Sequence, residues 1–155
     1  MTSATLPESG QFEGGVHSSA FRVYFEDTDA GGIVYHANYL RWYERARTEM
    51  LRFLGISLGR ALDQDTGTYV VSTIEMKFTG PARLDDVVTV ESRVEEVHKA
   101  SVRLHQVASV AGRRINEARI RLGFVGADGR PRRQPPHWLE AFAGVMPVQE
   151  GNSLK

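Results

Sequence analysis

The chain has no cysteine among its 155 residues. This absence excludes a disulfide framework, a thiolate metal site and a cysteine nucleophile, and it leaves carboxylates, histidines and hydroxyls for any chemistry. The chain also lacks an excess of either charge, because 19 Lys and Arg residues balance 19 Asp and Glu residues. No net field gathers polyanions, so nucleic acid is not an expected partner and an anionic ligand has to be bound locally.

Long apolar runs are missing as well. The first 20 residues contain nothing like the apolar core of a signal peptide, and no later stretch approaches the length of a membrane span. We therefore expect a cytoplasmic protein with no transmembrane segment. The length suits one compact unit. Small polar residues at both ends predict a flexible tail over 1–18, a single domain over 19–143 and a second flexible tail over 144–155.

Hydrophobic periodicity predicts one long helix among several strands. Residues 21–26 alternate with period two and favour a strand, and the acidic and glycine residues after them favour a turn. From 38 to 54 the period becomes helical, with Asn38 as the expected N-cap and Gly55 at the C′ position. Four further strands and a short terminal helix are expected over 70–78, 87–97, 101–110, 115–125 and 138–142.

This order predicts an α+β protein in which an antiparallel sheet of about five strands wraps around one long helix. The apolar phase drifts within 101–110, which predicts a bulge near Gln106. One helix cannot cover both faces of a sheet, so self-association is expected to cover part of the remaining surface.

The segment from 24 to 47, YFEDTDAGGIVYHANYLRWYERAR, concentrates the residues that can carry chemistry. Asp29 precedes a glycine turn and lies seven residues before His36, where a helix begins and offers unpaired backbone N–H groups. Acidic residues here also commonly end a strand or cap a helix, and a structural role in holding the loop is expected for Asp27. A metal site built from Asp27, Asp29 and His36 is a further alternative, although carboxylates two apart in an extended segment tend to diverge.

This segment resembles the signature of the 4-hydroxybenzoyl-CoA thioesterase superfamily, and within it the acyl-CoA thioesterases associated with the Tol-Pal system. The matching pieces are Asp27-Thr28-Asp29, Gly31-Gly32-Ile33-Val34-Tyr35-His36, Asn38-Tyr39 and Tyr43-Glu44-Arg45-Ala46-Arg47. The resemblance implies a hot-dog fold and hydrolysis of an acyl thioester to a free acid and a thiol carrier. It further implies that Asp29 is the catalytic carboxylate and that the backbone N–H of His36 polarises the thioester carbonyl.

Two points of this mechanism stay open at the level of sequence. Asp29 can attack the carbonyl directly or activate a water molecule, and the residues do not choose between these routes. Some branches of the superfamily use a glutamate on the central helix instead. Glu44 and Glu49 occupy that helix here, but the Asp-Thr-Asp pattern favours Asp29.

The resemblance also implies how the substrate is held. Coenzyme A presents phosphates that suit nearby cations, and the matching positions are Lys99, Ser101 and either Arg132 or Arg133, with Tyr35 as a further substrate contact. A solvated surface charge is the competing explanation for each basic residue. No metal or separate cofactor is implied, because coenzyme A is part of the substrate. The expected partners are acyl-CoA, acyl carrier protein as a second possible carrier, and further copies of this chain in a homodimer or homotetramer.

Two other functions fit parts of the sequence. A non-catalytic module that binds acyl-CoA or an acyl carrier would use the same groove without cleaving the thioester. A hydratase or dehydratase of the same fold relies on a catalytic histidine within a different motif, which this chain does not contain.

Overall fold

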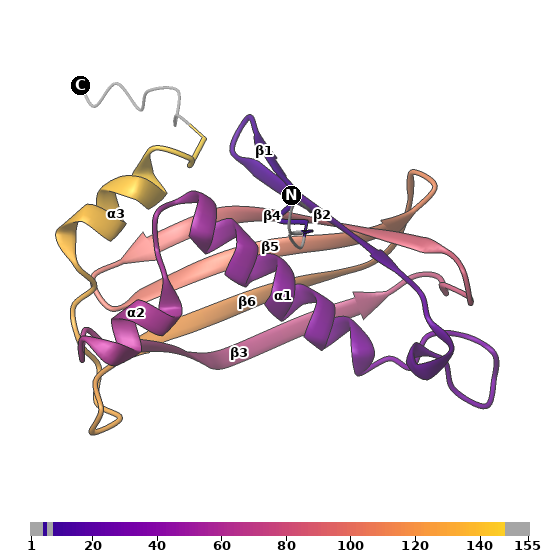
Figure 1. The fold of residues 1–155 in the computed structure, drawn as a ribbon, viewed down its shortest axis with the longest axis horizontal. Helices are drawn as coiled ribbons and strands as arrows, with labels where there is room; N and C mark the ends of the chain where they lie inside the picture. The colour runs from indigo at the N-terminus through magenta and orange to yellow at the C-terminus, as the bar shows by residue number, and fades with distance from the viewer. Residues whose placement is uncertain (1–4, 6–7, 148–155) are drawn as a thin grey trace, which may run out of the picture.

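The computed structural model describes Thr5 and residues 8–147, and its central element is one antiparallel sheet with a long helix lying across it (Figure 1). The six strands follow the order β1-β2-β4-β5-β6-β3. This is the expected α+β arrangement with one strand more than the sequence predicted. The elements are β1 (Gln11–Glu13), β2 (Val16–Arg22), η1 (Phe25–Asp27), α1 (Asn38–Phe53), α2 (Leu58–Asp63), β3 (Thr68–Phe78), β4 (Val87–His98), β5 (Ser101–Val110), β6 (Arg113–Val125) and α3 (Pro136–Ala143).

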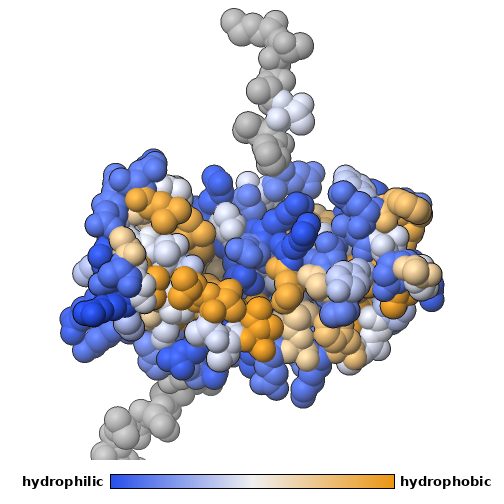
Figure 2. Space-filling model, turned by 90° about the horizontal axis from the view of Figure 1, so that it is seen from below, coloured by the Kyte–Doolittle hydropathy of each residue, from blue (hydrophilic) through white to orange (hydrophobic). Residues whose placement is uncertain are grey.

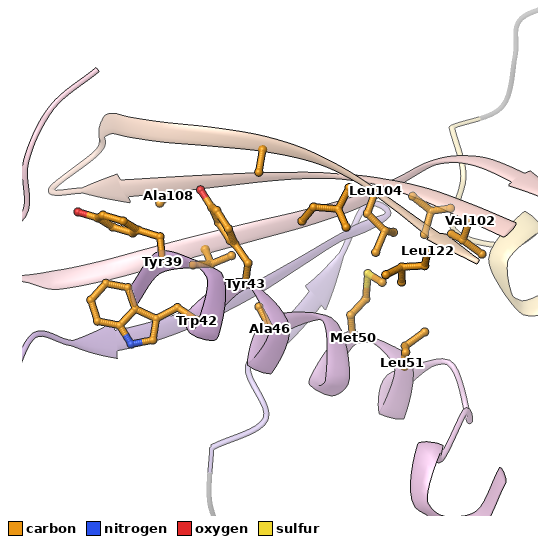
Figure 3. Packing of buried hydrophobic residues seen from close by; sticks show 14 of the residues in the cluster. Tyr39, Trp42, Tyr43, Ala46, Met50, Leu51, Val102, Leu104, Ala108 and Leu122 are labelled. Carbon is orange, nitrogen blue, oxygen red and sulfur yellow. The ribbon is translucent and has the colours of Figure 1, made fainter. Parts of the chain in front are cut away.

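The core lies between α1 and the concave face of the sheet. Tyr43, Ala46 and Met50 on α1 are fully buried and point toward β5 and β6 (Figure 3). Alternate residues of β4, β5 and β6 are buried against the helix. They are Val88, Val90, Val94, Val102, Leu104, Ala118, Ile120, Leu122 and Phe124.

A polar network crosses this core. Gln106 is fully buried; its Nε2 donates to the hydroxyl of Ser92 (2.9 Å) and to the carbonyl of Tyr43 (3.0 Å), and its Oε1 accepts from Nη1 of Arg47 (3.0 Å). Arg47 is 6% exposed, and this burial lowers the pKa of its guanidinium. The bulge predicted near Gln106 is displaced, because the inward phase continues through this polar side chain and the nearest register shift lies two residues further on, between Ala108 and Ser109 against β6. A second shift lies between Val94 and Glu96 of β4, opposite β5.

The N-terminal part of the sheet differs from the prediction. The expected tail over 1–18 and the expected strand over 21–26 are both wrong in part, since β1 pairs with β2, and β2 pairs with β4 from residue 17 to 22. Beyond β2 the chain turns through η1. His17 and Ser19 face α1 from β2 and are buried. Because this inward face is polar, apolar periodicity does not reveal the strand.

The other boundaries agree more closely. Gly55 has a φ of 78° after the end of α1, as expected for a C′ glycine. The terminal helix is longer than predicted and has proline in its first turn. The sequence did not indicate α2, whose N-cap is Ser57. Of the expected C-terminal tail, residues 148–155 lie outside the described residues, whereas Val145 and Met146 pack against the core.

Strand β3 forms an edge of the sheet and keeps large apolar side chains exposed. Val70, Val71, Ile74 and Phe78 are 44%, 46%, 39% and 50% exposed. Figure 2, seen from the β3 side, shows hydrophobic residues gathered across the middle of this face. A long apolar edge strand is a template for pairing with another strand. No helix in the described part of the chain is long and apolar enough to cross a membrane.

Candidate active site

The loop before α1 is tied to the helix by Asp27. Its Oδ2 accepts the backbone N–H of Tyr24 (2.7 Å), its Oδ1 accepts the side-chain amide of Asn38 (3.1 Å), and its carbonyl accepts the N–H of Tyr35 (2.9 Å). The expectation that Asn38 is the N-cap is wrong, since Ala37 takes that position without a side-chain hydrogen bond. Asp27 therefore has the structural role predicted for it.

Asp29 lies on the turn within this loop. Its backbone N–H donates to the carbonyl of Ile33 (2.9 Å), and its carbonyl accepts the N–H of Gly32 (3.0 Å). Gly32 has a φ of 77°, which favours glycine. Oδ1 of Asp29 accepts the N–H of Gly31 (2.8 Å). The side chain is exposed, and Oδ2 makes no hydrogen bond within the described residues, so one carboxylate oxygen can receive a proton or reach a substrate.

His36 lines a cavity of about 460 Å³ on the β3 side of α1. Its ring lies 4.6 Å from the ring of Tyr35 and 6.4 Å from that of Phe78, measured between centroids. Among the described residues, the backbone N–H of His36 has no hydrogen-bond acceptor. Such an N–H at a helix start can donate to an oxygen that gains negative charge. The wall of the cavity is largely apolar, and it includes Tyr39, whose pKa burial raises.

The structure brings only some of the predicted site residues together. Asp29, Tyr35 and His36 share one loop, but Asp29 and Tyr35 are not among the residues that line the His36 cavity. Phe78 and Arg83 do line it, and the sequence did not identify them. The only signal near them was Gly80-Pro81, which indicated the end of a strand and gave no reason to place that strand end beside the start of α1.

The predicted contacts to coenzyme A lie at the other end of the molecule. The β4–β5 turn and the segment before α3 meet there, where the N–H of Gln134 donates to the carbonyl of Lys99 (2.8 Å) and its amide donates to the carbonyl of Ser101 (3.3 Å). Nη1 of Arg132 donates to the carbonyls of Asp65 (2.7 Å) and Thr66 (3.2 Å).

Helix α1 separates this group from Asp29 within the chain (Figure 1). Its 16 residues span about 24 Å at roughly 1.5 Å per residue. Arg132 is engaged with backbone carbonyls, whereas Arg133 is exposed and makes no ion pair within the described residues. Of the two arginines that the sequence proposed, Arg133 is therefore the one available to a ligand.

The alternative site residues do not converge on His36. Glu49 lines a cavity on the β2 side of α1, together with Glu44, and neither residue lines the His36 cavity. The carboxylate of Asp27 is occupied by two hydrogen bonds. Within residues 8–147 and at Thr5, no group of three or more His, Cys, Asp or Glu residues is placed to hold a metal ion.

The fold and the loop before α1 define a hot-dog protein of thioesterase type. The model of the thioesterase-like superfamily matches residues 23–143, so the chain belongs to this superfamily. The chain is 47% identical over 85 residues to the acyl-CoA thioesterase YbgC of Haemophilus influenzae. That match covers 55% of this chain and 62% of the relative, so it spans less than two thirds of the relative's length.

Other relatives and solved structures agree. The acyl-CoA thioester hydrolase YbgC of Escherichia coli O6:H1 is 41% identical over 100 residues, which cover 64% of this chain and 74% of that protein. A probable thioesterase from Bartonella henselae superposes with a TM-score of 0.73 at 32% identity, over 77% of this chain and 99% of that one. A 4-hydroxybenzoyl-CoA thioesterase bound to 4-hydroxybenzoyl-CoA shares the fold, with a TM-score of 0.75 at 23% identity over 81% of this chain and 97% of that one. The predicted hot-dog fold is thus confirmed.

Proposed function

We propose that the chain hydrolyses acyl-CoA thioesters, with Asp29 as base or nucleophile and the backbone N–H of His36 as donor to the thioester carbonyl. The observation that carries this proposal is the free N–H of His36 at an apolar cavity, beside the turn that holds Asp29. An apolar acyl group fits the cavity wall of Ile33, Val34, Tyr39 and Phe78.

Both catalytic routes use the same groups. If Asp29 acts as base, it takes a proton from water while the water oxygen bonds to the acyl carbon, and the C–S bond then breaks to release the thiolate, which is protonated. If Asp29 acts as nucleophile, its carboxylate forms an anhydride with the acyl group and expels the thiolate, and water then hydrolyses the anhydride. In either route the His36 N–H stabilises the negative charge that develops on the carbonyl oxygen. Neither route needs a metal or a separate cofactor.

A second copy of the chain completes this site in our proposal. Lys99 and Arg133 lie at the opposite end of α1 from Asp29. A single copy of the chain therefore cannot place these two cations and Asp29 around the same short ligand. Antiparallel pairing of β3 with β3 of a second copy reverses one protomer against the other. The exposed apolar edge of β3 supports this pairing. The cations of one copy then lie beside Asp29 of the other and can bind the phosphates of coenzyme A.

A charge placed on β3 tests the pairing. Ile74→Lys puts a desolvation cost at the centre of the proposed interface, and we expect it to convert a dimer or tetramer to smaller species in light scattering. Activity should fall with the loss of assembly. Val87→Lys is the matched control, because Val87 has nearly the same exposure (40% against 39%) but lies on β4. An Ile74→Lys protein that keeps the assembly of the unchanged chain contradicts β3 pairing.

The activity itself is tested by thiol release from short, long, branched and aromatic acyl-CoAs and from acyl carrier protein. We expect release from at least one apolar acyl-CoA, with the free acid as the second product. Stabilisation of the protein by these ligands without turnover across the panel contradicts hydrolysis and assigns a binding module instead. Acyl carrier protein as a carrier and a cytoplasmic location stay predictions.

A further inference from the structure

A second cavity lies on the β2 side of α1, away from His36. Its volume is about 360 Å³, and it is bounded by Ser19 and Phe21 of β2, by Glu44 and Glu49 of α1, and by Glu8 of the segment before β1. The cavity that contains His36 is bounded instead by the loop before α1, by the first turn of α1, and by the end of β3 with the segment that follows it. The two cavities share no residue, so the second one is not part of the proposed thioesterase site.

Two of the residues that line this second cavity each have a buried side-chain oxygen with no hydrogen-bond partner among the described residues. One is Oγ of Ser19, a residue that is 8% exposed, and the other is Oε2 of Glu49. Ser19 shares the α1-facing side of β2 with Phe21, whose ring stacks on Trp42 of the helix. Its hydroxyl therefore points between the strand and α1. Buried polar groups are nearly always paired, so two unpaired atoms at one cavity indicate a ligand that supplies their partners.

The charges specify the kind of ligand. Three acidic residues, Glu8, Glu44 and Glu49, line the cavity, together with one basic residue, Arg45. Arg45 forms no ion pair with Glu49, whose Oε1 lies instead 3.8 Å from Nε of Arg52. A carboxylate oxygen can only accept hydrogen bonds. The complementary ligand is thus a cation that carries several N–H donors.

We propose that this cavity binds the protonated amine of a linear alkylamine or polyamine. One ammonium group donates to Oε2 of Glu49 and to Oγ of Ser19, and Glu44 and Glu8 balance a second positive charge further along the chain. The methylene groups contact the ring of Phe21. A quaternary ammonium has the same charge but no N–H donor, so it does not satisfy the two acceptors.

The test measures thermal unfolding and calorimetric binding of the full chain with spermidine, and with tetramethylammonium at matched ionic strength. We expect saturable stabilisation by spermidine alone. Glu49→Gln should weaken spermidine binding by roughly tenfold or more, because it replaces a charged acceptor by a neutral amide. Ser19→Ala is the second variant, and Glu140→Gln, at an exposed position of α3, is the control that should leave binding unchanged.

Three results would each overturn this inference: no stabilisation beyond that of the matched salt, equal effects of spermidine and tetramethylammonium, or unchanged binding in both Glu49→Gln and Ser19→Ala. The inference would also be overturned if Glu49→Gln changed the oligomeric state and no spermidine binding were found. That result would assign the cavity to contact with a second copy of the chain. None of these measurements uses thioester hydrolysis, so the result is independent of the proposed activity.

Discussion

Asp29→Asn is expected to reduce the turnover number for thiol release by about 10²–10⁴-fold, the usual effect of losing a positioned proton acceptor. The amide keeps the size of the carboxylate, and its oxygen can still accept the N–H of Gly31 that Oδ1 accepts now. What the substitution removes is the negative charge and the basic oxygen. We therefore expect KM to change little while kcat falls, because in our proposal substrate binding depends mainly on the cavity and on the cations that a second copy supplies.

The stability of Asp29→Asn should remain within roughly 0.5 kcal/mol of the unchanged protein, since the side chain is exposed. Asp128→Asn is a matched control. Asp128 is also exposed at a turn, and its Oδ1 accepts the N–H of the residue two positions later, Arg130 (3.0 Å). Both substitutions thus make the same local change, and only that at Asp29 should affect turnover. A folded Asp29→Asn protein with full activity would show that Asp29 is not the catalytic carboxylate.

Most of the fold could be predicted because its strands alternate cleanly. In β6 every second residue from Ala118 to Phe124 is apolar and buried, and the opposite side carries charge. The apolar stripe of α1, which includes Tyr43 and Met50, was equally clear in the sequence. Phe53 is the exception: it continues the pattern at the last turn of the helix, yet it is 49% exposed.

Two of the failures, the tail placed over β1 and β2 and the position of the bulge near Gln106, have a common physical cause, which is polar packing inside the core. His17 and Ser19 face the helix from β2, and Gln106 does so from β5, so the apolar period is interrupted where the backbone continues regularly. If every inward-facing position is assumed to be apolar, the sequence predicts a tail over β1 and the start of β2 and a bulge near Gln106. The hydrogen-bond partners of Gln106 come from distant parts of the chain, and periodicity contains no information about them.

The candidate site was only partly visible for a similar reason. A continuous segment of sequence contains Asp29 and His36, and the roles proposed for them rest on the resemblance together with the turn and the helix start. The cavity beside them also needs Phe78 and Arg83, which reach it through the pairing of β3 at the edge of the sheet. The sequence placed Lys99 and Arg132 in the same site as Asp29, whereas the structure separates them by the length of α1 within one protomer.

Gln106→Leu is expected to have the largest effect on stability. The substitution removes the acceptor of the buried Arg47 guanidinium and also leaves the carbonyl of Tyr43 and the hydroxyl of Ser92 without their donor. A buried charge without its partner costs about 3 kcal/mol or more. For a domain of this size we expect the midpoint of thermal unfolding to fall by roughly 6–12 °C.

A second substitution, Arg47→Met, tests whether Gln106 stabilises the buried charge of Arg47. It removes the buried charge and keeps most of the volume, but it leaves Oε1 of Gln106 without its donor, so we expect a cost of about 1–3 kcal/mol. Arg52→Met on the exposed side of the same helix serves as the control. Once the guanidinium is gone, Gln106→Leu no longer strands a charge. The double variant Arg47→Met/Gln106→Leu should therefore be more stable than Gln106→Leu alone, as measured by denaturant unfolding. Additive losses would mean that Gln106 does not stabilise the charge of Arg47, and that the destabilisation of Gln106→Leu comes from Tyr43 and Ser92 instead.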